Sequence, residues 1–205
     1  MKERPVIFNG EMVRAILDGR KTQTRRAINW KRQPYMEMAE RDDGSIWPWA
    51  EDCERGGDIW FPCPFGQVGD RLWVREAFGM QVRRDGLGGT GEFRVYRASN
   101  PDAVKYTTAC GKSVPVKWTP SIHMPRRASR ILLEITAVRV ERLNSISEED
   151  AKAEGYPVER EVDGGAYDPW LWFRDLWDGI YPDNDFKVNP WVWVIEFRRV
   201  EAQHG

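Results

Sequence analysis

The sequence predicts a mainly β fold, a small β-barrel with a few peripheral helices, and two observations support this prediction. Segments with the apolar alternation and β-branched content of strands recur along the chain, at residues 71–78, 131–143 and 191–197. Helical spacing is confined to short stretches, and strands and helices do not alternate in the βαβ rhythm of a parallel sheet. A barrel is favoured over an open sheet because a closed sheet leaves no unpaired edge.

The first 28 residues predict a strand, a short helix, a basic turn and an extended segment. Residues 6–8 are apolar and are expected to form the strand. Asn9 is a typical N-cap residue, and apolar residues at helical spacing follow it at 12–17. Gly19 stands where a helix C-cap glycine belongs, and we expect residues 22–28 to be extended.

Two long stretches show poor periodicity, and we expect them to be irregular insertions. The first covers about 30–68 and the second about 80–120, and both are rich in Gly and Pro. Within the second, residues 93–96 are expected to form one short strand. The 205 residues are thus expected to form one domain with two insertions.

The C-terminal half predicts the longest strand and two helices. The segment 131–143 alternates imperfectly, as a strand with one well-buried face would. Ser147 and Asp150 have the spacing of a capping box, which predicts a helix ended by Gly155. A second helix is expected at 170–180, from apolar residues at i, i+3, i+4 and i+7.

Composition points to a cytoplasmic protein without a cofactor. No apolar run approaches the roughly 20 residues that span a bilayer, and the N-terminus lacks the apolar stretch of a signal peptide. The three cysteines show no C-x-x-C spacing, so neither a disulfide framework nor a zinc site is indicated. The net charge of −1 argues against whole-surface binding to nucleic acid, although the segments 20–32 and 125–142 are locally basic.

The basic turn at 19–26, Gly-Arg-Lys-Thr-Gln-Thr-Arg-Arg, combines the side chains of two kinds of site. Its cations could hold phosphate groups. Alternatively, a lysine whose pKa is pushed down by neighbouring cations could activate a threonine hydroxyl as a nucleophile. Lys21 and Thr24 would point to opposite faces of a regular strand, so they converge only if Lys21 lies in the turn before the strand. The spacing does not fit a Walker A loop.

Four blocks of the sequence resemble the ASCH domain family, in its larger, phage- and prophage-associated branch. They are residues 16–26, 68–76, 122–130 and 189–197, and they occur in order from one end of the chain to the other. The first contains the G-x-K-T segment that is followed by a threonine two residues later. The resemblance implies a PUA-like β-barrel related to RNA-binding and RNA-modifying modules.

Some small members of this family are amidohydrolases that remove the acetyl group from N4-acetylcytidine. Carried over by position, their catalytic lysine, threonine and glutamate correspond to Lys21, Thr24 and Glu154, the last within a segment that resembles the helix bearing the acid. Other members are ribonucleases or have no known activity. This chain is about twice as long as the small amidohydrolases.

The sequence therefore leaves an enzyme and a binding module open. The enzyme would release acetate from a modified pyrimidine nucleoside. The binding module would recognise a nucleotide in RNA and hold its phosphates with arginines, which are Arg20, Arg25, Arg26 and Arg130. A ribonuclease that uses paired histidines is disfavoured, because the chain has two histidines and one of them lies in the C-terminal tail. A modified nucleoside or RNA is the expected partner, without a membrane or a sequence-specific contact to DNA. The residues expected to bind substrate are Arg26, Arg75, Glu76 and His123.

Overall fold

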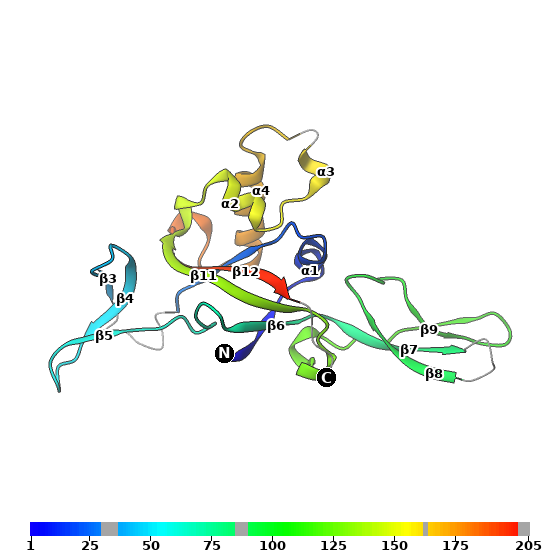
Figure 1. Ribbon diagram of the computed structural model, residues 1–205. Coiled ribbons are helices and arrows are strands. Elements are labelled where there is room, and N and C mark those ends of the chain that lie inside the picture. The colour runs from blue at the N-terminus through cyan, green and yellow to red at the C-terminus, as the bar shows by residue number, and fades with distance from the viewer. Residues whose placement is uncertain (30–36, 85–89, 162–163, 201–205) are drawn as a thin grey trace.

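A central five-stranded sheet organises the chain (Figure 1). The computed structural model describes residues 1–29, 37–84, 90–161 and 164–200. The sheet has the order β1-β6-β11-β12-β2. Its strands are β1 (Glu3–Ile7), β2 (Gln23–Ala27), β6 (Arg71–Arg75), β11 (Leu132–Arg142) and β12 (Trp191–Val200).

The three strands with the strongest apolar patterns are neighbours in this sheet, as predicted. β11 pairs with β6 on one side and with β12 on the other, and both pairings are antiparallel. β12 is apolar on both faces because both faces are covered. Trp193 and Ile195 belong to one buried cluster, while Val192 and Val194 belong to a second cluster that includes side chains of the C-terminal helix.

The expected closed barrel is not found in the described residues, which form an open sheet. Its edge strands, β1 and β2, are not paired with each other. β1 carries Pro5, which has no N–H to donate and is therefore suited to an edge strand. A side chain bridges the gap instead: Arg26 of β2 donates from Nη2 to the carbonyl of Ile7, at 2.9 Å. The sheet thus curls towards closure without a continuous ladder.

The predicted helices are present, and a further short one is added. Their bounds are α1 (Gly10–Leu17), α2 (Glu148–Ala153), α3 (Val158–Glu161) and α4 (Asp168–Ile180). Asn9 caps α1 by accepting from the Met12 amide, and Ser147 and Asp150 form the capping box of α2. None of the described helices is long and apolar enough to cross a membrane.

Both expected insertions contain more regular structure than the sequence predicted. Residues 37–60 form a three-stranded antiparallel sheet, and the described residues between 78 and 115 form two antiparallel strand pairs. The strands are β3 (Glu37–Glu40), β4 (Ile46–Glu51), β5 (Asp58–Trp60), β7 (Phe78–Arg84), β8 (Thr90–Tyr96), β9 (Val104–Thr107) and β10 (Ser113–Pro115). Figure 1 shows these two units projecting from opposite ends of the central sheet. The prolines and glycines correctly indicated turns in these insertions, but the strands between the turns are too short for their alternation to be recognised in the sequence.

Short 3₁₀ helices complete the described elements. Two precede β11, one follows it, and one precedes β12; they are Ser121–His123, Arg126–Ala128, Leu143–Ser145 and Phe186–Val188.

Candidate functional site

A close contact between two chain turns brings Lys21 and Glu154 together. Lys21 follows α1, and Glu154 is the C-cap residue of α2; the two residues form an isolated antiparallel bridge. Gly155 permits this contact in two ways. Its φ of +104° suits glycine, and a Cβ there would lie 2.9 Å from the Ala15 Cβ and 3.2 Å from the Lys21 Cβ.

The Lys21 amine is buried and makes two hydrogen bonds to one residue. Nζ donates to the Glu154 carbonyl at 2.9 Å and to Glu154 Oε2 at 2.7 Å. The side chains are 0% and 3% exposed. The Phe8 ring also faces this amine, with its centroid 5.6 Å from Nζ. Glu154 therefore supplies both hydrogen-bond acceptors that the Lys21 amine contacts.

Arg25 holds the other oxygen of the Glu154 carboxylate. Its fully buried guanidinium donates from Nη1 to Glu154 Oε1 at 3.4 Å. From Nη2 it donates to Asp150 at 3.0 Å and to Glu141 at 3.2 Å. The Gln23 amide donates to the Asp150 carbonyl at 2.8 Å and so ties β2 to α2. These contacts fix Glu154 from the side opposite Lys21.

The pKa of Lys21 lies below the usual value of a lysine. Burial is the largest cause, because it disfavours the charged form. The negative charge of Glu154 and its hydrogen bond raise the pKa and oppose this effect, whereas Arg26 and Arg25 lower it further. The net direction is towards the neutral amine, as a general base requires.

Thr24 is a buried residue of β2, where it is paired with Ile195 of β12. Lys21 precedes the strand, as its convergence with Thr24 requires. Thr24 and Glu154 line the same hollow of about 20 Å³, against Met12 of α1 and Phe173 of α4. Among the described residues, none forms a hydrogen bond with the Thr24 hydroxyl, so the predicted bond to Lys21 is not made in this structure.

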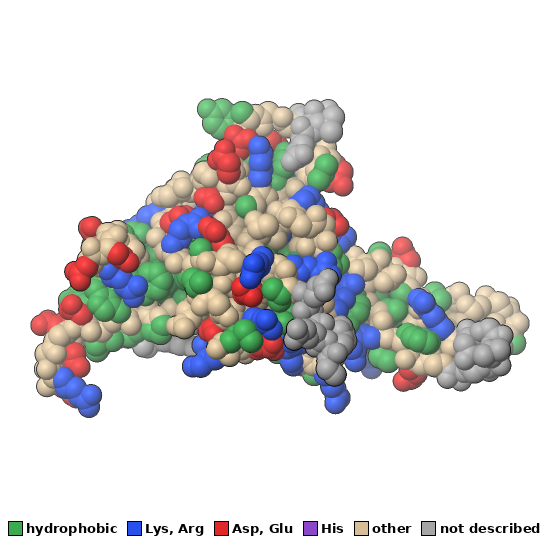
Figure 2. All heavy atoms as spheres, in the orientation of Figure 1, with side chains coloured by type: hydrophobic (Ala, Val, Ile, Leu, Met, Phe, Trp, Pro, Cys, Tyr) green, Lys and Arg blue, Asp and Glu red, His purple; other side chains and the backbone are tan. Residues whose placement is uncertain are grey.

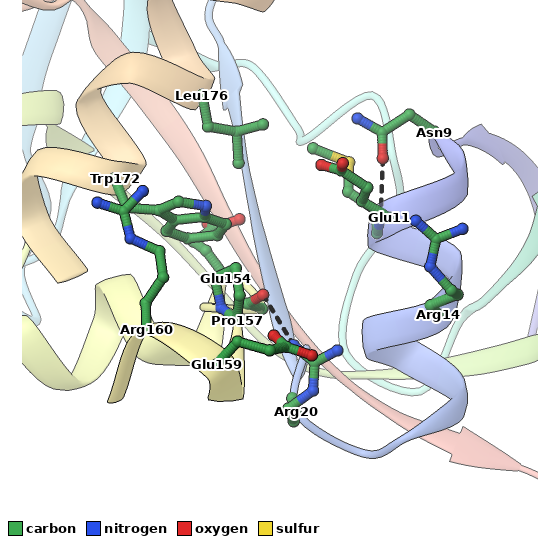
Figure 3. A pocket seen from close by; sticks show the side chains of 12 residues that line it. Asn9, Glu11, Arg14, Arg20, Glu154, Pro157, Glu159, Arg160, Trp172 and Leu176 are labelled. Carbon is green, nitrogen blue, oxygen red and sulfur yellow. Dashed lines mark hydrogen bonds between the residues drawn. The ribbon is translucent and has the colours of Figure 1, made fainter. Parts of the chain in front are cut away.

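Glu154 also lies in the wall of a larger cleft, of about 320 Å³. Figure 3 shows the side chains of α1 on one side of this cleft and those of α4 on the other. Glu11 and Arg14 come from α1, and Trp172 and Leu176 come from α4. The volume falls in the range of roughly 300–1,000 Å³ that is usual for small-molecule sites.

The charged side chains of the cleft are balanced and mostly engaged. Arg20 donates to the carbonyls of Gly155 and Tyr156, at 3.1 and 2.9 Å, and binds Asp18. Arg160 forms a two-pronged ion pair with Asp168, at 2.8 and 2.7 Å. Against the three arginines that line the cleft stand three glutamates, Glu11, Glu154 and Glu159.

Trp172 is the aromatic wall of the cleft. Its ring packs edge-on against Tyr156, with centroids 5.7 Å apart and an interplanar angle of 82°. The Tyr156 hydroxyl donates to Asp168 at 2.5 Å, so the residue behind Trp172 is itself held in place. The indole can therefore offer a positioned flat surface to a planar ligand.

The four residues expected to bind substrate lie in different surroundings. Arg26 lines the small hollow beside Thr24, and its guanidinium is 5.4 Å from the centroid of the Phe8 ring. Arg75 donates to the Ser121 carbonyl at 3.1 Å, and His123 is exposed in the following 3₁₀ helix. The described residues that line the larger cleft include none of these four residues, Arg26, Arg75, Glu76 and His123.

Glu76 forms a second buried ion pair, with Arg130. Both carboxylate oxygens accept from the guanidinium, at 2.8 and 3.0 Å. Arg130 also donates to Ser99 at 2.8 Å and lies 4.1 Å from the centroid of the Tyr96 ring. The pair thus joins the end of β6 to the segment that leads into β11.

Two contributors to the site were missed by the sequence analysis. Arg25 was expected to hold phosphate, but the structure buries it against three carboxylates. Trp172 is one of six tryptophans that the sequence offers as stacking surfaces for bases, most of them expected in the core, and the sequence did not single it out. The alternation Lys21, Gln23, Arg25 was the available signal for the first, because residues two apart on a strand share a face. In the described residues, His, Cys, Asp and Glu side chains form no group of three or more that could hold a metal ion.

Comparisons with known proteins found similar solved structures, two of which are described here. One is an ASCH domain from Lactobacillus crispatus JV V101, 15% identical, covering 98% of this chain and 81% of that chain, with a TM-score of 0.39. The other is protein EF3133 from Enterococcus faecalis V583, of family DUF984, 12% identical, covering 100% of this chain and 85% of that chain, with a TM-score of 0.41. No family model and no curated protein matched the sequence. The first structure carries the family name that the sequence motifs suggested.

Proposed function

We propose that the protein is a hydrolase that removes the acyl group from a modified pyrimidine nucleoside, with N4-acetylcytidine as the substrate to test. One observation carries this proposal: the buried Lys21 amine donates twice to Glu154, and Glu154 lines the same hollow as Thr24, whose hydroxyl has no hydrogen-bond partner among the described residues. A lysine in this condition can act as a base.

In the first step, Thr24 is the nucleophile and Lys21 is the base. The neutral amine takes the hydroxyl proton while the Thr24 oxygen attacks the amide carbonyl and forms a tetrahedral intermediate. A rotation of the Thr24 side chain or of the lysine chain must first bring the two atoms into hydrogen-bond contact, since unliganded geometry is often loose. The intermediate then collapses, and the bond between carbonyl carbon and amine nitrogen breaks.

Glu154 orients Lys21 throughout and serves the proton transfer. The proton taken by Lys21 passes to the leaving amine of cytidine, directly or by way of the Glu154 carboxylate. Thr24 then carries the acetyl group as an ester. Water, deprotonated by Lys21, attacks this ester and releases acetate, and the proton returns to the Thr24 oxygen. Arg25 holds the Glu154 carboxylate in place during these steps.

A free nucleoside suits the cleft better than a nucleic acid strand. The three arginines of the cleft are matched by three glutamates, and Arg20 and Arg160 already bind other groups. Figure 2 shows acidic and cationic side chains interspersed on this face of the molecule, without a continuous basic surface. A strand of phosphates would require such a surface. Trp172 would stack on the base, and Arg26 would contact the substrate from the side of Thr24.

A binding module without turnover is the second candidate, and Arg14 favours it. Arg14 lines the cleft and has no carboxylate partner among the described residues; its one hydrogen bond is to the Ala98 carbonyl at 3.3 Å. It could hold one phosphate of a nucleotide whose base stacks on Trp172. This candidate predicts affinity for a nucleotide that is lost in Arg14→Gln, with no acetate released.

The test compares two variants that each change one group of the Thr24 side chain. Thr24→Val keeps the volume of the buried side chain and removes the hydroxyl, whereas Thr24→Ser keeps the hydroxyl. With N4-acetylcytidine as substrate, cytidine and acetate should be released by the natural protein and by Thr24→Ser, and release should fall by a factor of about 10² or more in Thr24→Val.

Thermal melting of both variants provides the control for folding. If the natural protein releases no acetate at high enzyme concentration, the deacetylase proposal is rejected for this substrate. Equal rates in Thr24→Val and the natural protein would remove Thr24 from the mechanism.

A further inference from the structure

We infer that the cavity between the three-stranded insertion and the central sheet binds a nucleotide, with the base against tryptophan and the phosphate on Lys2 and Arg41. This second site does not depend on the proposed hydrolase. The nucleotide could be free or could belong to a single strand, since both offer the same base and phosphate chemistry.

The cavity has a volume of about 590 Å³, larger than that of the cleft beside Glu154. Four parts of the chain meet there. Lys2 comes from the N-terminus, Arg41 and Trp47 from the β3–β4 region, Trp60 from β5, and Val138 from β11. No residue that lines the cleft also lines this cavity, so the two sites can be changed separately.

One face of the insertion carries three indoles. Trp49 is directly opposite Trp60 in the β4–β5 ladder, and Trp47 lies two residues before Trp49, so all three share a face. Each is half-buried rather than fully enclosed. The Trp47 ring also packs edge-on against Trp193 of β12, 5.0 Å between centroids, which holds it against the central sheet. Fixed indoles of this kind can serve as stacking surfaces for bases.

Two cations at this cavity lack an anionic partner. The Arg41 guanidinium lies 4.2 Å from the Trp47 ring centroid and 5.1 Å from that of Trp60. Within the described part of the chain, the side chains of Arg41 and Lys2 form no hydrogen bond or ion pair. The indoles thus hold the guanidinium while its N–H donors remain available.

The hydrogen bonds from Ser45 and, to a smaller extent, the charge of Arg41 lower the pKa of Asp43, but no described acid near the cavity forms an ion pair with Arg41 or Lys2. Asp70 is already engaged, since it accepts from the Lys2 amide at 2.7 Å and binds Arg4 at 2.9 Å. Asp42, Asp43 and Asp58 line a neighbouring hollow beyond Arg41. None of them lies within 4.0 Å of the Arg41 guanidinium, the limit for an ion pair. A ligand phosphate would therefore be the first anion to contact both Lys2 and Arg41.

Binding of a short fluorescein-labelled single-stranded RNA to the full chain tests this site, with fluorescence anisotropy as the readout. The double variant Lys2→Gln with Arg41→Gln should weaken binding by about tenfold, as the loss of charge-assisted contacts implies. Arg55→Gln is the control for the loss of a single charge, because it removes one positive charge from an exposed position of the insertion. Lys2→Gln alone should weaken binding by about threefold, and this exposed position leaves the packing of the insertion unchanged.

Competition separates the two sources of the ligand. Displacement of the labelled strand by CMP, but not by cytidine, would show that a single nucleotide with its phosphate fills the cavity. Displacement by unlabelled strand alone would assign the cavity to a strand.

Two outcomes would overturn the inference. One is binding by the double variant that is as tight as that of the natural protein. The other is a loss found only in Arg14→Gln, which would place the strand in the cleft beside Glu154. Neither outcome bears on acetate release, so failure here and failure of the hydrolase proposal are distinguishable.

Discussion

Two ion pairs of this chain, each with a buried glutamate, differ in how the cation contacts the carboxylate. Glu76 and Glu154 are both almost fully enclosed, at 2% and 3% exposure, and each accepts from a cation. Arg130 donates hydrogen bonds to both carboxylate oxygens of Glu76 and a further one to the Ser99 hydroxyl. Lys21, in contrast, meets one carboxylate oxygen and one carbonyl of Glu154.

The partner cation decides the chemistry of each pair. Arginine stays charged under all ordinary conditions and matches a carboxylate with two parallel bonds, so the Glu76 pair is saturated. Lysine can lose its proton when it is buried, and Lys21 is fully buried beside a cleft. The arginine pair is suited to joining segments, whereas a pair whose cation can lose its proton can also transfer a proton.

Removing the two carboxylates should produce unequal losses of stability. Glu154→Leu leaves Lys21 and Arg25, both fully buried, without a shared counter-ion, and we expect a loss of about 3–5 kcal/mol in the free energy of unfolding. Glu76→Leu leaves Arg130, whose side chain is 26% exposed and can turn to water, and we expect about 1–3 kcal/mol. Urea unfolding of both variants measures this difference, and equal losses would contradict it.

The pH dependence of stability should reveal the lowered pKa of Lys21. Between that lowered pKa and the ordinary value of 10.5, the unfolded chain binds more protons than the folded chain. The free energy of unfolding contributed by this residue therefore rises with pH across the window. Subtracting the curve of Lys21→Met from that of the natural protein isolates the contribution. A difference that falls with pH would mean that the pKa of Lys21 is raised instead.

The smallest effects are expected for Arg75 and His123. Both were predicted to bind substrate, and neither lines the described cleft. Arg75→Gln and His123→Ala should therefore leave kcat/KM for N4-acetylcytidine within about twofold of the natural value, because distant surface changes contribute little. Steady-state kinetics checks this. A tenfold rise in KM for either variant would restore the substrate-binding role that the sequence suggested.

Local rules accounted for most of the central sheet and the helix ends. The Asn9 cap, the capping box at Ser147 and the neighbouring positions of β6, β11 and β12 follow from spacing and residue type. The contact of Lys21 with Glu154 did not follow from spacing, because it joins residues 133 apart in the sequence. The family resemblance supplied that pair, and the structure supplied its distance and burial.

The remaining features depend on tertiary contacts that a single sequence does not display. The strands β3 to β5 are three to six residues long, too short for a periodicity to stand out from proline and glycine. The barrel was expected from the need to protect sheet edges. In the structure the Arg26 side chain meets Ile7 at those edges, and no alternation rule predicts such a bridge.

The most direct measurement compares turnover in Lys21→Met and Arg130→Met at equal concentrations of folded protein. Each variant removes the cation from one of the two buried pairs. We expect Lys21→Met to lose about 10²–10⁴-fold in kcat for N4-acetylcytidine, the usual contribution of a general base. Arg130→Met should keep the rate of the natural protein, whatever it loses in stability. Turnover that survives in Lys21→Met, or that falls equally in both variants, would contradict the assignment of Lys21 as the base.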